Sequence, residues 1–403
     1  MKRGKVYFIL IVIIVTLILF FAFNDGTNQE KFQNKYSDEN IQRDINVLNQ
    51  VDDKVNCVEK TIYKYSPVNL EKTKVVVPFG LMAGNHVTPV DHQYFQNFNN
   101  LEPNIEVYSV DGGIVKNIQS MTGRYYDPGQ NKEIEVTDYR LTIDHPCEIS
   151  SIYIHVAKLS EKLSKFAPEK DSYTTVNVEV NAGEIIGWYT SNVDFNLVDN
   201  NFLLKGFVNP EYYKSESWKV HVPPTFDYFT EDIKNKMIEK SLRSVEPFEG
   251  KFDHDIDGKL IGNWFEENTN FYEGLNRENY WETHISISPD YIDPTYFIIS
   301  LGNYEGRPAQ FGTKTNSPFP SDVSTESGII KYELTSYQYY VDNILWDRKS
   351  VAKGIKAKSS ESQVEGTVLF QLLEDRKLKV EIFPRKKGSE VNGFTINAKI
   401  YER

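Results

Sequence analysis

Most of the chain after residue 60 consists of short segments in which apolar and polar residues alternate. The alternation is strict in "KLKVEIFP" and "FTINAKIY", and the turn-forming residues Asn, Asp, Gly and Pro recur about every ten residues. The 25 Tyr and 24 Phe residues add a bias toward strands. Because successive side chains of a strand face opposite sides of a sheet, the pattern predicts a mainly β protein whose strands bury one face.

An uninterrupted apolar run, "VYFILIVIIVTLILFFAF", occupies residues 6–23. As a helix it spans roughly 27 Å, enough to cross a thin bilayer. Lys2, Arg3 and Lys5 precede it, so the positive-inside rule predicts a cytoplasmic tip (1–5), a single-pass transmembrane signal anchor (6–23) in the cell membrane, and an extracytoplasmic remainder. A cleaved signal peptide is the alternative, but the run is long for one and no A-x-A-like cleavage site follows.

The rest of the chain divides into four parts. Residues 24–60 are polar without apolar periodicity, which indicates a stalk. Residues 61–205 hold strand-like segments and predict a first β domain in which only residues 157–166 look helical. Residues 206–249 predict a connector with one helix over 231–242, since Ile233, Met237 and Ile238 lie on one helical face. Residues 250–403 predict an antiparallel β-barrel or sandwich.

Charge, motifs and cysteines narrow the function classes. The formal net charge of −12 disfavours nucleic acid as a partner. The motifs G-x-x-x-x-G-K-[ST], G-x-S-x-G, H-E-x-x-H and C-x-x-C are absent from the sequence, which removes the commonest nucleotide-binding, serine hydrolase, zincin and redox hypotheses. Cys57 and Cys147 are able to form a disulfide in an extracytoplasmic compartment, with two unrelated buried thiols as the alternative.

The candidate chemistry is concentrated in histidines. Of the seven in the chain, His86, His92, His145 and His155 lie within about seventy residues, and histidine with aspartate on a β scaffold is typical of a Zn²⁺ site. If "NHVTPVDHQYF" is a strand, His86 and His92 share a face, whereas Asp91 points away unless a bulge intervenes.

Four segments in order carry a family resemblance: "NHVTPVDHQYF", "IEVYSVDGGIVKNIQ", "LTIDHPCEISSIYIHVAKL" and "VEVNAGEIIGWYTS". Together, over residues 78–199, they resemble the lysostaphin and LytM type of zinc metallopeptidase, a β-sheet fold with a duplicated hybrid motif that cleaves peptide cross-links of peptidoglycan. The resemblance implies that His86 is a zinc ligand and that Asp91 or His92 is the second, since the spacing departs from the family's H-x-x-x-D. It also implies that His155 assists catalysis and that His145 matches a histidine that is usually structural.

The family's last motif, H-x-H-F, is replaced here by Asn192, Val193, Asp194 and Phe195. Asn192 cannot shuttle a proton, whereas Asp194 is an acceptable zinc ligand. Three interpretations follow: a ligand-binding relic without metal, a metal site without standard peptidase activity, and a hydrolase with rewired zinc ligands. We expect a non-catalytic or altered relative of the metallopeptidases that binds an envelope polymer or a surface protein, with zinc as a candidate cofactor.

The segment "GKLIGNWFEE" opens the second run of strands. Its Gly262 and Trp264 resemble the G-x-W signature of lipocalin-like barrels, in which the Trp packs under a late Arg; Arg403 is the candidate here. A sandwich with a buried Trp is the alternative. An empty barrel interior predicts carriage of a small apolar ligand, and an interior filled by side chains does not.

Overall fold

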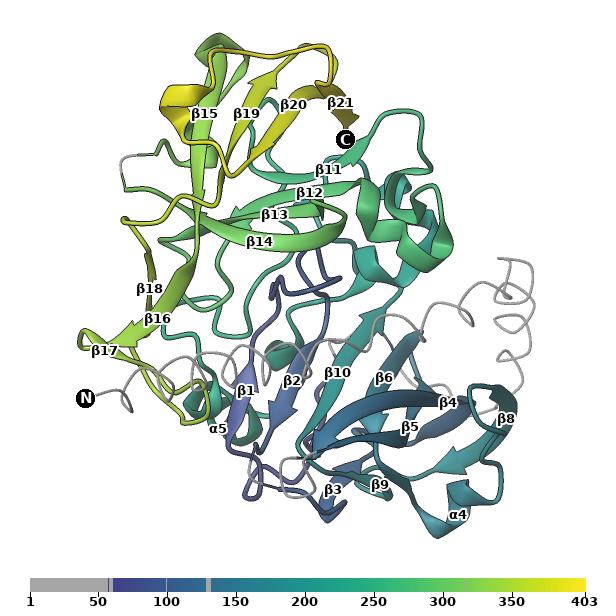
Figure 1. Cartoon of the computed structure of the whole chain (residues 1–403). Helices are drawn as coiled ribbons and strands as arrows, with labels where there is room; N and C mark the ends of the chain where they lie inside the picture. Colours follow the sequence, from purple (N-terminus) through teal and green to yellow (C-terminus); the bar gives the residue numbers. More distant parts are fainter. Residues whose placement is uncertain (1–56, 58–60, 99, 128–131, 316) are drawn as a thin grey trace.

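The computed structural model describes residues 57, 61–98, 100–127, 132–315 and 317–403. The predicted cytoplasmic tip, the transmembrane anchor and all of the stalk except Cys57 lie outside the described residues. Within those ranges, no helix is both long enough and apolar enough to cross a membrane. The expectation of mainly β structure is confirmed: antiparallel sheets and one closed antiparallel barrel make up the fold (Figure 1).

The first unit is built on a seven-stranded antiparallel sheet with the strand order β1-β2-β10-β6-β5-β4-β8. A three-stranded sheet, β3-β9-β7, packs beside it. The strands of the larger sheet are β1 (Val75–Val77), β2 (Gln93–Gln96), β4 (Gly113–Asp127), β5 (Lys132–His145), β6 (Ile149–Val156), β8 (Tyr173–Val180) and β10 (Asn192–Asp199). Those of the smaller sheet are β3 (Ile105–Tyr108), β7 (Lys158–Leu159) and β9 (Ile185–Tyr189).

The core of the first unit follows from the alternation seen in the sequence. In β8, Val176, Val178 and Val180 are buried while the residues between them are exposed. These valines join one apolar cluster with side chains from β4, β5, β6 and β10. The helical expectation for residues 157–166 is largely wrong, because β7 takes its start and α4 (Glu161–Ser164) is a single turn capped by Ser160.

A connector of short helical segments follows β10. It consists of η2 (Pro210–His221), η3 (Thr225–Tyr228) and the helix α5 (Glu231–Lys240). Met237 is fully buried against the first core, and Ile233 and Ile238 pack beside it. The predicted helix is therefore confirmed, and it buries the face on which its apolar residues are spaced. The 3-10 segment η2 begins with Pro210, which suits the first helical position because its missing N–H needs no partner there.

The second unit is a closed barrel of eight antiparallel strands. Its strands, in order around the barrel, are β11 (Gly262–Glu266), β12 (His284–Pro289), β13 (Phe297–Tyr304), β14 (Arg307–Thr313), β15 (Ile329–Thr335), β19 (Gly366–Leu372), β20 (Lys377–Pro384) and β21 (Lys399–Glu402). Short 3-10 segments lie in the connections: η4 (Phe271–Glu273), η5 (Arg277–Thr283), η6 (Pro320–Asp322), η7 (Thr325–Ser327) and η8 (Gly388–Glu390). Pairing of β21 with β11 closes the barrel.

The barrel interior is filled by the protein's own side chains. Tyr332 is completely buried between Phe297 and Phe370, with ring centroids 5.8 and 5.9 Å away. Branched aliphatic side chains of β12, β13, β15, β19 and β20 complete the same cluster. This packing leaves the interior to side chains, which argues against carriage of an apolar ligand.

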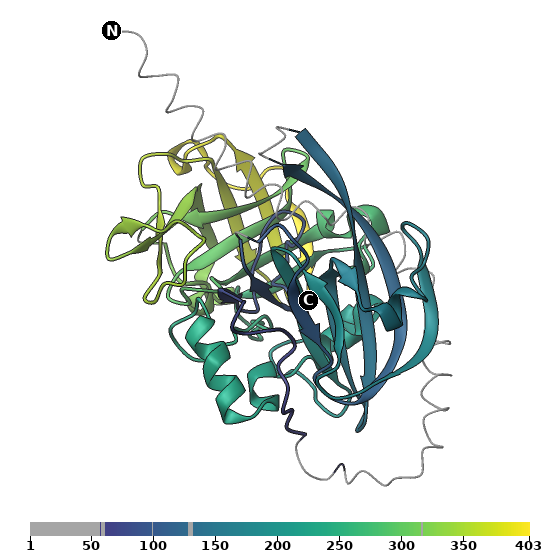
Figure 2. The ribbon, with the colours of Figure 1, turned by 90° about the horizontal axis from the view of Figure 1, so that it is seen from below.

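A three-stranded excursion interrupts the barrel between β15 and β19. It consists of β16 (Tyr337–Val341), β17 (Ile344–Leu345) and β18 (Lys356–Ser359). The sequence predicts one strand through "GIIKYELTSYQYY", but the chain leaves the barrel at Ser336, and Tyr339 packs in a cluster with Val75, Leu81 and Tyr94 of the first unit. The excursion therefore joins the two units, which lie side by side in both views (Figure 2).

Candidate functional site

The segment that carries His86, Asp91 and His92 is a loop that precedes β2. Backbone hydrogen bonds hold it: His86 N donates to the carbonyl of Ala83, and Val90 N donates to that of Leu81. Strand alternation does not apply to a loop, so the expectation that Asp91 points away from the two histidines is wrong. All three side chains line one cavity of about 80 Å³.

This cavity lies at the junction of the two units. Its first wall is the loop and the sheet, including Arg140 of β5 and Asn196 of β10. Its second wall is the connector and the start of the barrel unit, and the residues that supply it are Glu216, Trp218, Lys219, Tyr272 and Tyr280. Segments η2, η4 and η5 thus cover the part of the first unit that carries His86, Asp91 and His92.

Asp194 lies next to two other candidate residues, His92 and His155. In the sheet, Asp194 lies opposite Tyr94 of β2 and Ile154 of β6. One oxygen of its buried carboxylate, Oδ2, lies 3.6 Å from His92 Nε2 and 3.7 Å from His155 Nε2. Burial raises the pKa of Asp194, and the two imidazoles act against that shift.

His155 reaches Asp194 because the edge of β6 is irregular. The register between β5 and β6 shifts between Tyr139 and Leu141, and His155 has a φ of 69°. That left-handed conformation costs a residue with a side chain about 1–3 kcal/mol, and it is found most often at functional positions. Its Nδ1 lies 2.7 Å from Oδ2 of Asp138, a carboxylate that sequence reasoning missed.

Both ring nitrogens of His92 already have protein partners. Nδ1 lies 3.1 Å from Asp91 Oδ1 and Nε2 lies 2.9 Å from the Tyr94 hydroxyl. The His86 ring packs edge-on against that of His92 at 5.8 Å between centroids. Burial, with the nearby His92 and Lys219, lowers the pKa of His86 to about 3, so this imidazole is neutral at physiological pH.

A lysine from the connector accompanies Asp91 in the cavity. Lys219 is 3% exposed, and its Nζ lies 3.7 Å from Asp91 Oδ1. Burial acts to raise the pKa of Asp91, but the Lys219 charge and the hydrogen bond with His92 outweigh it and hold that pKa below its usual range. The ammonium also lies over the Tyr272 ring, 5.2 Å from its centroid, where the π face attracts a cation.

The arrangement does not fit a zinc ion. In the described ranges, no group of three or more His, Cys, Asp or Glu side chains is placed to hold a metal. Asp91 already faces the cation of Lys219, and His92 would have to give up Tyr94 or Asp91 to become a ligand. Asp194 accepts a weak contact from Asn192, whose Nδ2 lies 3.4 Å from Oδ1. The candidate residues instead form a polar network in which Asp91, His92, Asp194 and Lys219 contact one another or their neighbours.

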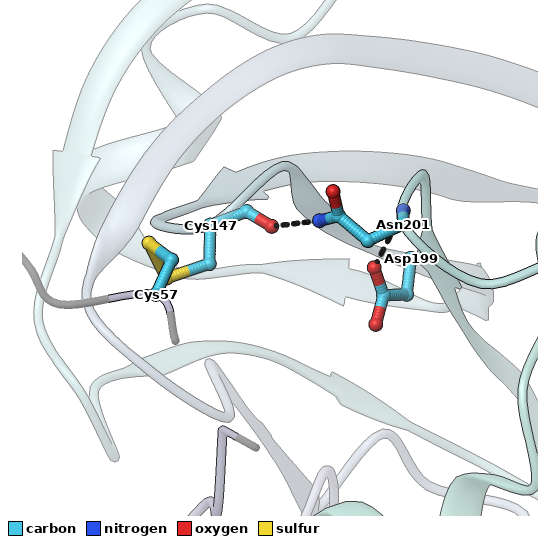
Figure 3. Close-up of a disulfide and its surroundings, with 4 residues drawn as sticks. All are labelled: Cys57, Cys147, Asp199 and Asn201. Carbon is cyan, nitrogen blue, oxygen red and sulfur yellow. Dashed lines mark hydrogen bonds between the residues drawn. A yellow bond between two sulfur atoms is a disulfide. The ribbon is translucent and has the colours of Figure 1, made fainter. Parts of the chain in front are cut away.

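The other predicted residues lie outside this cavity. His145 contacts Gly112 O through Nδ1 at 3.0 Å and Ser151 Oγ through Nε2 at 2.7 Å, between β5 and β6. Burial lowers its pKa. Cys57 and Cys147 form a disulfide, and Asn201 Nδ2 donates to the Cys147 carbonyl at the same turn (Figure 3).

Gly262 and Trp264 lie at one end of the barrel, with Arg403 beside them. The Arg403 guanidinium lies 4.1 Å from the Trp264 ring centroid and donates to the carbonyl of Ile256 at 2.5 Å. Gly262 has a φ of 116°, and a Cβ there would overlap the Asp255 carboxylate. The glycine of the G-x-W signature is therefore required by both conformation and space.

Sequence reasoning missed the second wall of the cavity. Arg140, Glu216, Lys219 and Tyr272 belong to no motif, and three of them lie in or next to 3-10 segments without periodicity. One signal was present: Lys219 stands between Trp218 and Val220 in "ESWKVHV", where a charge inside an apolar run indicates a buried partner.

Comparisons with known proteins identify no family. No family model matches the chain, and no curated protein matches it. The binding domain of paraclostridial mosquitocidal protein 1 aligns over 83% of this chain and 92% of its own, at 10% identity and a TM-score of 0.15. The binding domain of botulinum neurotoxin serotype G aligns over 82% and 88%, at 9% identity and a TM-score of 0.13. Neither likeness is strong enough to indicate a shared fold or function.

Proposed function

We propose that the chain is a membrane-anchored extracytoplasmic recognition protein that binds a polymer of the cell envelope without cleaving it. Its first unit is, in this proposal, a divergent relative of lysostaphin-type peptidases, and its second a barrel of lipocalin type. The contact of Arg403 with Trp264 supports the second relationship. The Cys57–Cys147 disulfide supports an oxidising, extracytoplasmic location.

The observation that carries the proposal is the buried pair of Lys219 and Asp91. A zinc peptidase needs a metal with an open coordination position and a group that moves a proton. Here an ammonium faces the carboxylate that the resemblance assigns to the metal, and the connector covers the cleft. A polar cavity between two rigid units suits the capture of a small part of a larger molecule.

Sedimentation with an insoluble polymer tests the proposal. The purified full-length chain, kept in detergent, is mixed with cross-linked peptidoglycan and centrifuged, and the supernatant is assayed for new peptide amino groups and the protein for zinc. We expect the chain to sediment with the polymer, to release no amino groups and to carry zinc far below one ion per chain. Lys219→Gln should weaken sedimentation at least tenfold, whereas Lys170→Gln, which changes an exposed lysine of the first unit, should not.

The competing function is a metal-dependent hydrolase of envelope peptides. Its signature in the same experiment is one zinc ion per chain, lost in His86→Ala, together with steady release of amino groups. Either that result or a failure of the wild-type chain to sediment would overturn the proposal.

A further inference from the structure

Charged side chains that line the junction cavity have buried atoms without a hydrogen-bond partner. Among the described residues, Asp91 Oδ2 and Arg140 Nε are buried and have no hydrogen-bond partner. The Lys219 ammonium lies 3.7 Å from Asp91 Oδ1, which is longer than a hydrogen bond, and its charge also acts on Glu216. A buried charged group that lacks a hydrogen-bond partner is unfavourable unless a ligand supplies one.

The positions of these groups are fixed by aromatic neighbours. The Arg140 guanidinium lies 5.6 Å from the centroid of the Trp218 ring, and Lys219 lies between the rings of Tyr272 and Phe252, at 5.2 and 5.8 Å. Arg140 comes from the sheet and Lys219 from the connector, so these two parts of the chain present one cation each. Preorganised donors of this kind bind a ligand without a further ordering cost.

The lining carries basic and carboxylic side chains in equal number, which restricts the net charge of a ligand that it can bind. Two basic side chains, Arg140 and Lys219, face two carboxylic side chains, Asp91 and Glu216. Burial raises the pKa of Glu216, and the charges of Lys219 and Arg140 act against that shift and favour its carboxylate. A ligand with a net charge would leave one buried charge uncompensated, which disfavours its binding. A neutral ligand that carries both signs satisfies the free acceptor on Asp91 and the free donors on Arg140 and Lys219 together.

The size of the cavity sets the scale of that ligand. A volume of about 80 Å³ holds roughly five to eight water-sized groups, and glycine or alanine has about five or six non-hydrogen atoms. The volume therefore suits a small amino acid or one end group of a polymer.

We propose that this cavity is a binding site for a small α-amino acid zwitterion, free or as the end group of a chain. The ligand's carboxylate is held by Arg140 Nε and the Lys219 ammonium, and its ammonium is held by Asp91 Oδ2. The inference rests on the proposed recognition function, for which it names the group that is recognised.

Calorimetric titration of the full-length chain with glycine, alanine of either hand, acetate and methylammonium tests the site. We expect saturable binding of glycine or alanine and at least tenfold weaker binding of acetate, which lacks the ammonium, and of methylammonium, which lacks the carboxylate. Arg140→Gln and Asp91→Asn should each weaken amino acid binding at least tenfold. The control Arg376→Gln changes an exposed arginine far from the cavity and should leave it unchanged.

Folding of each variant is followed by circular dichroism, and Arg140→Lys provides a milder change that keeps the charge but removes the Nε donor. Equal binding by wild type and both cavity variants, or acetate binding as tight as that of alanine, would overturn the inference. If no amino acid binds while peptidoglycan still sediments the chain, the inference fails and the proposed function stands. If alanine binds while peptidoglycan does not sediment the chain, the proposed function fails instead.

Discussion

The Arg403 guanidinium stacks on the Trp264 ring at 4.1 Å from its centroid, and both side chains are buried at one end of the barrel. Arg403 also donates to the carbonyl oxygens of Ile256, Lys259 and Ile261. One side chain thus ties the segment before β11 to the end of β21.

Replacing this arginine should destabilise the barrel strongly. We expect Arg403→Ala to lower the free energy of unfolding by about 3 kcal/mol or more, because three carbonyls and the Asp255 carboxylate lose a buried cationic partner. Urea unfolding monitored by tryptophan fluorescence measures the change. Arg376→Ala, which removes an exposed ion pair with Asp257, should cost less than about 1 kcal/mol; equal losses for the two variants would contradict the prediction.

The Lys219–Asp91 pair should show strong coupling in a double-mutant cycle. Lys219→Met and Asp91→Asn each leave a buried partner without its counter-charge, so each should cost about 3 kcal/mol, whereas the double variant should cost much less than their sum. Chemical denaturation of the four proteins gives the coupling energy. The exposed pair Lys236–Asp232 is the matched control, and its coupling should stay below about 0.5 kcal/mol. Additive losses at Lys219 and Asp91 would show that the pair is not a unit.

The disulfide should contribute to the stability of the first unit. Cys57 and Cys147 are 90 residues apart, and constraint of a loop of that length in the unfolded chain corresponds to about 4.6 kcal/mol in the chain-entropy model. A reducing agent should therefore lower the melting temperature of the wild type. A Cys57→Ser, Cys147→Ser double variant should melt at the lower temperature with or without reductant, and a further decrease on adding reductant to it would point to another cause.

The free energy of unfolding should fall as the pH rises from about 4 to about 6, because of Asp290. Burial raises the pKa of Asp290 to about 6, and hydrogen bonds from the Asp293 N–H, the Tyr339 hydroxyl and the Ile292 N–H act against that shift. A carboxyl whose pKa is higher in the folded state stabilises the fold below its unfolded pKa, and this contribution is lost as the pH rises through about 6.

The variant Asp290→Asn removes this titration. Relative to wild type, its free energy of unfolding should rise by about 3 kcal/mol between pH 3.5 and pH 7. Urea unfolding at a series of pH values gives the difference curve. A flat difference curve for Asp290→Asn would refute the assignment.

The sequence predicts those parts of the fold that depend on local periodicity. Alternation identifies the buried valines of β8 and the two-faced strand β20, and the spacing of Ile233, Met237 and Ile238 identifies α5. These patterns succeed because each strand or helix buries one face of its own against a core, whatever its partner is.

The candidate site is predictable only in its first half. His86, Asp91 and His92 stand close together in the sequence, but their orientation depends on a loop, to which strand periodicity does not apply. Lys219 reaches Asp91 across 128 positions of the chain through a 3-10 segment that has no repeating pattern. The same holds for Tyr339, whose packing against the first unit follows from an excursion that sequence alternation treats as one continuous strand. Contacts of this kind depend on topology, which single-sequence patterns do not encode.

The pairing of β11 with β21 also determines when the barrel can close during biosynthesis. Phe265 can pair with Glu402 only after the 136 residues between them have been synthesised. A nascent chain therefore exposes the apolar inner face of β11 until synthesis of the whole barrel is complete. The seven-stranded sheet is different, because its last strand, β10, ends at Asp199 and its strands have all been made earlier. Molecular chaperones therefore have a long interval in which to meet the unfinished second unit. A stalled or truncated chain that lacks β21 will carry a folded first unit attached to an open, aggregation-prone sheet.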